Sequence, residues 1–360
     1  MEEAHYRALL RLAYLDLPPR RLLGLLEHFE HPEAIFESSR HELLRVDGMT
    51  ESAAARILNA PDLPENLWQK CTQGDIRLLT WRDDDYPTAL KEIEDFPPLL
   101  FVRGSLQEHD RFAVAIVGTR KPTSYGRNVA ERLARELSRY GLTVVSGGAR
   151  GIDTAAHTGA LRAGGRTLAV LGCGVDIAYP PESAPLFNCI ATQGALLSEY
   201  PPGIQPDAWR FPVRNRLVSA LVLGVLVVEA PNDSGALITA TYALEQGKPV
   251  FAVPGNIDTG QSAGCHRLIK EGAVLVDSVE DIVRTLGIAP EPPPERPAPL
   301  PELTLTQQEV LRALSLTPKH VDALAEELKL PVAQLNAELL MLEMHHLVRR
   351  QPGNTYIRVP

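Results

Sequence analysis

The sequence is short of cysteine, long hydrophobic runs and secretion signals, and each absence excludes a class of protein. Its four cysteines, Cys71, Cys173, Cys189 and Cys265, are far apart among 360 residues. They form no CxxC pair and no zinc-binding spacing, so we expect free, buried thiols in a reducing compartment. No apolar run approaches the ~18 residues that a membrane span requires. We therefore expect neither a disulfide-stabilised protein nor a membrane protein.

The first residues, MEEAHYRALLRLAYLDL, are acidic and then amphipathic. A secretory signal would begin with basic residues, continue with an apolar stretch and end at small residues, and none of these features is present. We expect the protein to be cytoplasmic.

Sequence motifs for cofactors and catalysis are also missing. No GxGxxG lies in register after the first predicted strand, and GxxxxGK[ST], HExxH and GxSxG do not occur. Ser146 and Ser234 have no identifiable base, Glu229 has no matched second acid, and we expect Asp153 to cap a helix and His157 to be structural. We therefore expect no cofactor, no metal, no catalytic residue and no enzymatic activity.

The net charge of −9 is unevenly distributed. Residues 111–220 hold thirteen basic and seven acidic residues, a net charge of +6 against −15 for the rest of the chain. A basic domain within an acidic protein is typical of a protein that binds an anionic polymer. A chance fluctuation over solvated surfaces is the alternative.

Residues 1–70 have helical patterning. Within them, LLRVDGMTESAAARIL (43–58) indicates two helices joined at Gly48, with Thr50 as the N-cap of the second. The pattern is similar to a SAM or helix-hairpin-helix module. A small packing or interaction module is favoured over a DNA-binding one, since Gly48-Met49-Thr50 replaces the usual Gly-hydrophobic-Gly turn.

Residues 75–287 alternate between short apolar runs and helical segments. The apolar runs are mostly continuous, as in parallel strands that are covered on both faces. They lie at 111–118, 142–147, 167–172, 195–200, 221–230, 249–255 and 273–276. Helical segments such as 126–140 and 235–246 separate them, which predicts an α/β fold with an extended Rossmann-like, mostly parallel, doubly wound sheet. The runs 76–81 and 99–104 are expected to add edge strands.

Two further segments complete the chain. Residues 288–302 contain seven prolines, which predicts an extended, semi-rigid linker. Residues 303–360 show three helices and a terminal hairpin, the pattern of a winged-helix domain. Its presumed recognition helix, PVAQLNAELLMLE, carries two glutamates and no basic residue. We therefore expect the winged-helix domain to contact a protein or to regulate, and not to recognise duplex DNA through this helix. Arg349 and Arg350 on the wing are the exception that could contact DNA.

Several glycine-rich turns follow the predicted strands, where ligands of such sheets bind and helix N-termini bind anions. They contain Gly118, Arg120 and Lys121 after the first strand, Ser146, Gly147, Gly148, Arg150 and Gly151 after the second, and Ser234 and Gly235 after a later one. The arginines suit exposed phosphate oxygens, which guanidinium groups bind bidentately. The alternative is that these arginines pair with acids of the fold, such as Asp153 or Glu229.

The segment DAWRFPVRNRLVSA (207–220) is the third basic element. It places Phe211 beside Arg214, Asn215 and Arg216. An aromatic ring among arginines is suited to single-stranded nucleic acid, since bases stack on the ring and arginines bind the backbone. Plain core packing of the aromatic residues is the alternative.

These segments form an ordered set: IVGTRKPTSYG, SGGARGIDTAAH, LGCGVDIAYPPE, SEYPPG, FPVRNRLVSAL, VVEAPNDSGALITATYALEQGKPVFAVPG and GCHRLIKEGA. In this order they resemble the DNA processing protein A family (DprA, also called Smf), strongly over about 112–287. The helical N-terminal module and the winged helix also match that family's domain layout.

The resemblance implies a single-stranded DNA-binding protein of natural transformation and recombination, which protects single strands and helps load the RecA recombinase. It also implies a homodimer with no catalytic step. By this resemblance Arg120 contacts phosphate and Phe211 contacts a base. Arg214, Asn215 and Arg216 form the family's RNR segment, and the turn Ser146–Gly151 supplies backbone donors.

Two other classes compete with this interpretation. One is a nucleotide phosphoribohydrolase of the lysine-decarboxylase-like (LOG) group, whose PGGxGTxxE motif provides a glutamate. This sequence has PNDSGALIT at the nearest place, without a glutamate in register. The other is a scaffold built from the helical and winged modules.

Overall fold

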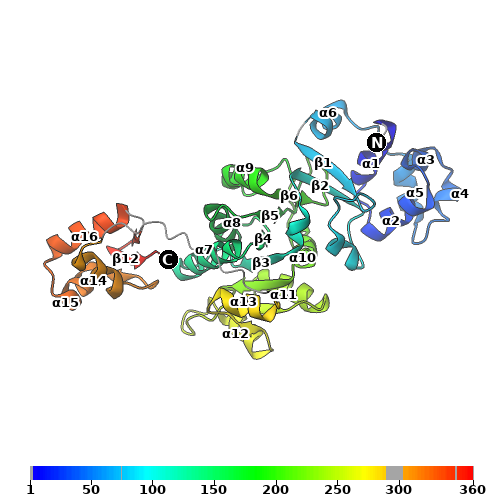
Figure 1. Ribbon diagram of the computed structural model, residues 1–360. Helices are drawn as coiled ribbons and strands as arrows, with labels where there is room; N and C mark the ends of the chain where they lie inside the picture. The colour runs from blue at the N-terminus through cyan, green and yellow to red at the C-terminus, as the bar shows by residue number, and fades with distance from the viewer. Residues whose placement is uncertain (1–2, 74, 289–302, 345–346, 360) are drawn as a thin grey trace.

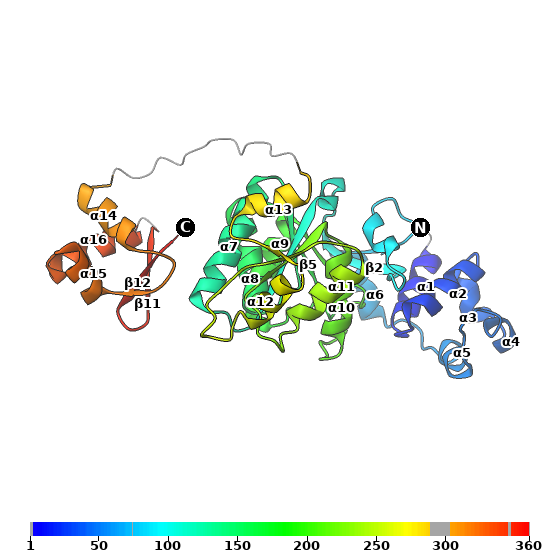
Figure 2. The same ribbon diagram turned by 90° about the horizontal axis from the view of Figure 1, so that it is seen from below.

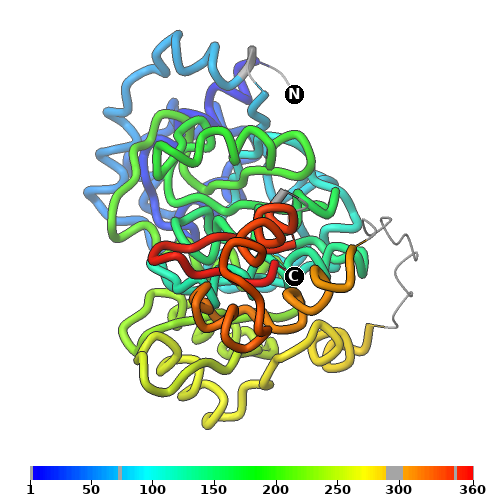
Figure 3. Tube along the Cα trace, turned by 90° about the vertical axis from the view of Figure 1, so that its left-hand side faces the viewer, coloured from blue at the N-terminus to red at the C-terminus, as the bar shows by residue number. Residues whose placement is uncertain are grey.

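The computed structural model describes residues 3–73, 75–288, 303–344 and 347–359. Its parts lie in a row, with the N-terminal helices at one end, a large sheet in the middle and a small helical domain at the other end (Figures 1 and 2). Figure 3 looks along this row, with the C-terminal domain in front of the sheet. The predicted linker 288–302 falls outside the described residues except for Ile288. Within the described part of the chain, no helix has both the length and the apolar character of a membrane span.

Short helices form the N-terminal region. They are α1 (Glu3–Ala13), α2 (Pro19–His28), α3 (Pro32–Glu37), α4 (Arg40–Leu43), α5 (Glu51–Leu58) and α6 (Glu65–Gln73). Gly48 has a φ of +68°, and the Thr50 hydroxyl accepts a hydrogen bond from the Ala53 amide, so the expected turn and N-cap are present. Leu25 and Ile57 belong to one core with Phe101 of the sheet, so these helices pack directly on the sheet.

The central sheet has nine strands in the order β1-β2-β6-β5-β4-β3-β7-β8-β9. Their bounds are β1 (Ile76–Thr80), β2 (Leu99–Gly104), β3 (Ala113–Gly118), β4 (Thr143–Ser146), β5 (Thr167–Val170), β6 (Ala195–Ser198), β7 (Gly224–Val228), β8 (Val250–Ala252) and β9 (Val274–Leu275). The pairs from β6 to β9 are parallel, whereas β1 and β2 are antiparallel additions. The doubly wound parallel sheet is thus confirmed. Of the two runs that were expected to add edge strands, β1 lies at an edge, whereas β2 lies inside the sheet between β1 and β6.

Helices cover both faces of the sheet. They are α7 (Ser124–Arg139), α8 (Ile152–Arg162), α9 (Ala184–Gln193), α10 (Arg210–Ala220), α11 (Ala236–Glu245), α12 (Ala263–Lys270) and α13 (Val279–Thr285), with 3-10 turns at Thr88–Glu92, Glu108–Arg111 and Pro181–Ser183. Successive β3 side chains point to opposite faces. Ala115 and Val117 pack with α10 and α11, and Ile116 packs with α7 and α8. Both faces are therefore core, which explains the continuous apolar runs.

The order in which the chain adds strands to the sheet changes sides at β3, although β3 and β7 are parallel. β4, β5 and β6 extend the sheet on one side of β3, whereas β7 pairs with β3 on the other side. The loops that leave β3 and β7 therefore separate and leave a crevice at the carboxyl ends of these strands.

The C-terminal domain consists of α14 (Leu305–Ala313), β10 (Lys319–His320), α15 (Val321–Leu328), α16 (Val332–Met344), β11 (Val348–Gln351) and β12 (Thr355–Arg358). Three helices and the β11–β12 hairpin confirm the predicted winged helix. It has its own core, which includes Val310, Leu335 and Tyr356. The Ser124 hydroxyl of the sheet domain donates a hydrogen bond to Gln351 Oε1 at 3.2 Å, and Leu316 packs against the sheet-domain core that includes Ile116.

The cysteines are free, as expected, but not all are buried. Cys71, Cys173 and Cys265 are buried, whereas Cys189 on α9 is exposed. The expectation of four buried thiols was therefore wrong for Cys189, which lies on the solvent side of an amphipathic helix.

Candidate functional site

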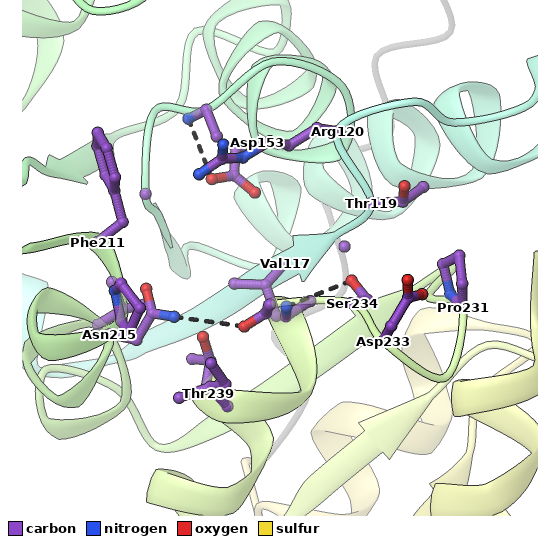
Figure 4. A pocket seen from close by; sticks show the side chains of 18 of the residues that line it. Val117, Thr119, Arg120, Asp153, Phe211, Asn215, Pro231, Asp233, Ser234 and Thr239 are labelled. Atoms are coloured by element: carbon purple, nitrogen blue, oxygen red, sulfur yellow. Dashed lines mark hydrogen bonds between the residues drawn. The ribbon is translucent and has the colours of Figure 1, made fainter. Parts of the chain in front are cut away.

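A cavity of about 530 Å³ lies in the crevice between β3 and β7. Its walls come from the loops after β3, β4 and β7 and from helices α10 and α11 (Figure 4). Nine of the predicted site residues line it: Gly118, Arg120, Lys121, Gly147, Phe211, Arg214, Asn215, Ser234 and Gly235. Arg150 lines a small adjoining cavity of about 40 Å³. Ser146, Gly148, Gly151 and Arg216 line neither cavity.

Arg120 is the exposed cation of this site. It lies in the loop between β3 and α7, and in the described part of the chain it forms no ion pair. Its guanidinium carbon lies 5.4 Å from the centre of the Phe211 ring. Lys121 beside it is also exposed. The rim of the cavity therefore carries two solvated positive charges next to an aromatic ring.

Phe211 is part of an aromatic stack. Its ring lies 5.4 Å from the Tyr179 ring at an interplanar angle of 24°. Tyr179 is 39% exposed, so one ring of this stack is open to solvent. The prediction did not include Tyr179, although it lies within the quoted motif LGCGVDIAYPPE. Only the tertiary fold brings the loop after β5 against the start of α10.

In the turn after β4, neighbouring loops and side chains approach the backbone of two glycines closely. A Cβ atom on Gly147 would lie 2.6 Å from an Arg214 nitrogen and 2.8 Å from Asp153 Oδ2. Gly151 has a φ of +85°, and a Cβ there would lie 2.4 Å from the Thr119 carbonyl oxygen. Glycine is thus required at position 151, where the left-handed φ and the β3-loop backbone exclude a side chain. At position 147 a Cβ would displace the buried Arg214 and Asp153 side chains.

This turn is less open to a ligand than predicted. The Ser146 hydroxyl is buried and donates to the Ile116 carbonyl, and Gly148 packs against Phe187. The Ala149 amide donates to Asp153 Oδ2 at 3.1 Å. The Ala149 amide is thus engaged within the turn. Gly147 lines the main cavity and Arg150 the small one, whereas Ser146, Gly148 and Gly151 line neither. That this turn supplies backbone donors to a ligand stays a prediction.

Arg150 itself is paired with an acid. Its Nε donates to Glu182 Oε1 at 2.5 Å, and both side chains are 59% exposed. Because this pair is exposed, it contributes little to stability and exchanges readily with other anions. The hydrogen bond to Glu182 raises the pKa of Arg150, so the side chain stays charged.

Arg214 forms the buried floor of the cavity. Its guanidinium donates to the Gly147 carbonyl at 2.5 Å and also to the Val170 carbonyl. Asp153 lies close by and is buried as well. Burial raises the pKa of Asp153 and lowers that of Arg214, while their mutual attraction opposes both shifts. Arg214 thus holds two strand-end loops together with its charge facing the cavity.

Arg216 does not belong to the site, which corrects the prediction. Its side chain is 3% exposed and makes a bidentate pair with Glu199 at 2.8 and 2.7 Å. Its Nε donates to Asp95 Oδ2 at 2.8 Å. Burial alone would lower the pKa of Arg216, but the two carboxylates raise it above its usual value. At about 100° per residue, Arg216 points almost opposite to Arg214 on α10.

The opposite wall comes from α11 and the loop before it. Asn215 Nδ2 donates to the Gly235 carbonyl at 3.4 Å, and Ser234 Oγ accepts from the Ala236 amide at 3.3 Å (Figure 4). Asp233 lies beside Ser234 and is exposed. In Figure 4, Phe211 and Asn215 lie on one side of the view and Ser234 and Asp233 on the other.

The candidate catalytic groups have structural roles here. Glu229 accepts hydrogen bonds from the amide and the hydroxyl of Thr123, both at 2.7 Å, which fixes the start of α7. His157 is buried and its Nδ1 lies 2.7 Å from Thr167 Oγ1. Burial lowers the pKa of His157 to about 3, so the imidazole is neutral. Neither side chain lines the cavity.

The comparisons with known proteins identify the relatives of this chain. The sequence profile described as "DNA recombination-mediator protein A" matches residues 77–287, and the one described as "DprA winged helix domain" matches residues 293–354. The chain belongs to the DprA (Smf) family. The expectation drawn from the ordered motifs is thus confirmed.

Curated relatives cover most of the chain. Protein Smf of Synechocystis is 34% identical over 94% of this chain and 95% of its own length. The DNA processing protein DprA of Streptococcus pneumoniae is 47% identical over 56% of this chain and 71% of its own length. Protein Smf of Escherichia coli is 37% identical over 88% of this chain and 87% of its own.

Two solved DprA structures share the fold. The S. pneumoniae DprA structure superposes with a TM-score of 0.67 at 39% identity, covering 76% of this chain and 95% of that chain. A Helicobacter pylori DprA, in a structure whose subject is its single-stranded DNA binding mode, gives 0.53 at 33% identity and covers 59% and 95%. The extended Rossmann-like fold of the DprA proteins is therefore confirmed for this chain.

Proposed function

We propose that this protein binds single-stranded DNA across the cavity between β3 and β7. The observation that carries the proposal is the pairing of an exposed, unpaired Arg120 with the Tyr179–Phe211 stack at the cavity rim. An aromatic face stacks on any base, and a solvated guanidinium binds the adjacent phosphate, so the site suits a strand of any sequence. The single-stranded DNA binding mode described for the H. pylori relative supports this assignment.

In this proposal the contact residues fall into three groups. Arg120, Lys121 and Arg150 bind phosphates, whereas Phe211 and Tyr179 stack on a base. Gly118, Gly147, Arg214, Asn215, Ser234 and Gly235 shape the cavity and contribute polar contacts. Among the described residues, two carboxylates line the cavity, Asp153 and Asp233, and Asp153 is engaged with the Ala149 amide. We therefore propose binding without a catalytic step.

We further propose the cellular role that family membership suggests. The protein would act in natural transformation and recombination, in the cytoplasm, as a homodimer that protects incoming single strands and helps load the RecA recombinase onto them. The basic stretch 111–220 supports the DNA part of this role, since its charge is opposite to that of the rest of the chain.

The test is a titration of fluorescently labelled oligo-dT with the full chain and with Arg120→Ala and Phe211→Ala variants. Each variant is expected to bind about 5- to 100-fold more weakly, since one stacked base is worth roughly 1–3 kcal/mol and a charge-assisted contact roughly 1.5–3. Arg139→Ala is the matched control, because Arg139 is an exposed arginine at the far end of α7.

Equal loss of affinity in Arg139→Ala would overturn the assignment of the site. Failure of the full chain to bind oligo-dT would overturn the function itself. Release of free base from a nucleoside monophosphate would instead favour the phosphoribohydrolase alternative.

A further inference from the structure

The N-terminal helices carry a cluster of metal-binding side chains at the other end of the sheet domain from the winged helix. His5 comes from α1, His31 is the N-cap residue of α3, and Glu33 lies in the first turn of α3. One ligand atom from each of the three lies within 4.8 Å of the others. Among the described residues, no other group of three or more His, Cys, Asp or Glu side chains has such spacing.

The carboxylate of this cluster is incompletely satisfied. Glu33 Oε2 is buried and accepts no hydrogen bond among the described residues. Its neighbour His5 Nδ1 lies 3.7 Å away, which is too long for a hydrogen bond. A buried carboxylate oxygen without a donor is unfavourable, and a bound cation would satisfy it. This oxygen is an observation separate from the clustering itself, and it points to a cation.

The donor set and spacing fit one class of metal. Two imidazoles and one carboxylate suit Zn²⁺ and similar divalent transition metals, whereas Mg²⁺ and Ca²⁺ prefer oxygen ligands alone. Tetrahedral ligands at ~2.0–2.2 Å from zinc lie about 3.4 Å apart. The 3.7 Å between His5 Nδ1 and Glu33 Oε2 is within a few tenths of an ångström of that distance. All three ligand atoms lie within 4.8 Å of one another, so the side chains must close further on a bound ion.

We propose that His5, His31 and Glu33 form a zinc-class metal site that ties α1 to α3. The site has three protein ligands, and His31 is exposed, so water completes the coordination. Bound metal stabilises the helical module, because α1 and α3 separate when the chain unfolds and the site exists only in the fold. The site is independent of the proposed DNA cavity and does not rest on it.

The test is isothermal titration of the full chain, first freed of metal with a chelator, with ZnCl₂. One zinc per chain is expected to bind. His5→Ala, His31→Ala and Glu33→Gln are each expected to weaken binding at least about 100-fold, because even loss of a group that only supports a ligand costs ~10- to 100-fold. Zinc is expected to raise the Tm of the unmodified chain and not that of His31→Ala.

His31→Ala is the decisive variant because it is expected to fold. The His31 side chain is exposed and makes no capping hydrogen bond to α3. His41→Ala, an exposed histidine on α4, is the matched control and is expected to bind zinc normally. Oligo-dT binding by His31→Ala is expected to be unchanged.

Three results would overturn the proposal: no zinc uptake by the full chain, an equal loss in His41→Ala, or undiminished uptake when His5 and His31 are both replaced. In the first case His5 and Glu33 would form a simple ion pair.

Discussion

At the residue scale, Arg214 and Arg216 on α10 are only two positions apart, yet their side chains have different partners. Arg214 faces the cavity and holds the Gly147 and Val170 carbonyls, whereas Arg216 is enclosed by Glu199 and Asp95. Both side chains are buried, but only Arg214 lines the cavity. The two residues therefore differ in what their loss affects.

Arg216→Ala is expected to destabilise the fold rather than weaken DNA contact directly. It would leave Glu199 buried, with its side chain 11% exposed, and without its bidentate partner. Breaking a buried pair in this way costs about 3–5 kcal/mol. Urea denaturation of the variant measures this cost, and Arg120→Ala is expected to change stability by less than about 0.5 kcal/mol. Unchanged stability in Arg216→Ala together with lost DNA binding would contradict this account.

Phe211 is expected to act by stacking and not by charge. Phe211→Ala should lower affinity for oligo-dT about 5- to 100-fold, with the same salt dependence as the unmodified chain, because no phosphate contact is lost. Phe211→Trp keeps an aromatic face and should retain most of the affinity. Fluorescence anisotropy at several salt concentrations measures both properties. A changed salt dependence in Phe211→Ala would show that the ring is not acting as a stacking platform.

The roles of individual side chains were the hardest feature to predict from the sequence. Arg120 and Phe211 were predicted because their local patterns, a strand-end turn and an arginine-flanked aromatic, carry information. The role of Arg216 was not predictable, because one of its partners, Asp95, lies 121 positions away. Tyr179 was missed for the same reason, since its stack with Phe211 exists only in the folded chain.

At the element scale, the junction of the β3 loop, the β4 turn and α8 shapes the site. Gly151 precedes α8 and touches the Thr119 carbonyl, which belongs to the same loop as Arg120. The start of α8 thus sets the position of the Arg120 loop. The sequence predicted a glycine turn here, but not that its glycines serve packing between loops.

Gly151→Ala is expected to be more destabilising than Gly164→Ala. Both glycines have positive φ, +85° and +70°, so each alanine is strained by at least about 1–2 kcal/mol. Only at Gly151 would the new Cβ also clash with backbone, whereas nothing lies within 4 Å at Gly164. Thermal unfolding measures the difference, and oligo-dT binding should weaken only in Gly151→Ala. Equal Tm values for the two variants would contradict the packing role.

Helix α8 also carries a pH-sensitive connection to the sheet. His157 contacts Thr167, whose hydroxyl donates to the Val144 carbonyl, so α8, β5 and β4 are linked. Burial lowers the pKa of His157 from 6.5 to about 3. The unfolded chain therefore binds a proton that the fold does not, and this stabilisation is present above pH 6.5 and is lost as the pH falls toward 3.

His157→Gln is expected to be less stable than the unmodified chain at pH 7, with a smaller difference at pH 5. The pH dependence of the two free energies of unfolding should differ by up to about 1.4 kcal/mol per pH unit in this interval. Urea denaturation from pH 7 to pH 5 checks it. Parallel pH profiles for the two chains would show that His157 is not held neutral by the fold.

At the scale of the whole molecule, the site follows from topology. The order of strands places the ends of β3 and β7 side by side, and the loops that leave them diverge. The continuous apolar runs and the turns were enough to predict a doubly wound parallel sheet, because they are local signals, but they did not predict its strand order. The packing of the N-terminal helices onto the sheet through Phe101 was not predictable, since it depends on distant surfaces.

The central claim is that Arg120 neutralises a phosphate of a single strand beside the Phe211 stack. The slope of log K against log salt concentration for oligo-dT tests it most directly, since each neutralised phosphate contributes about −0.7 for a single strand. The account predicts that Arg120→Ala is less steep by about 0.7, while Arg139→Ala keeps the slope of the unmodified chain. Equal slopes for Arg120→Ala and the unmodified chain would contradict it.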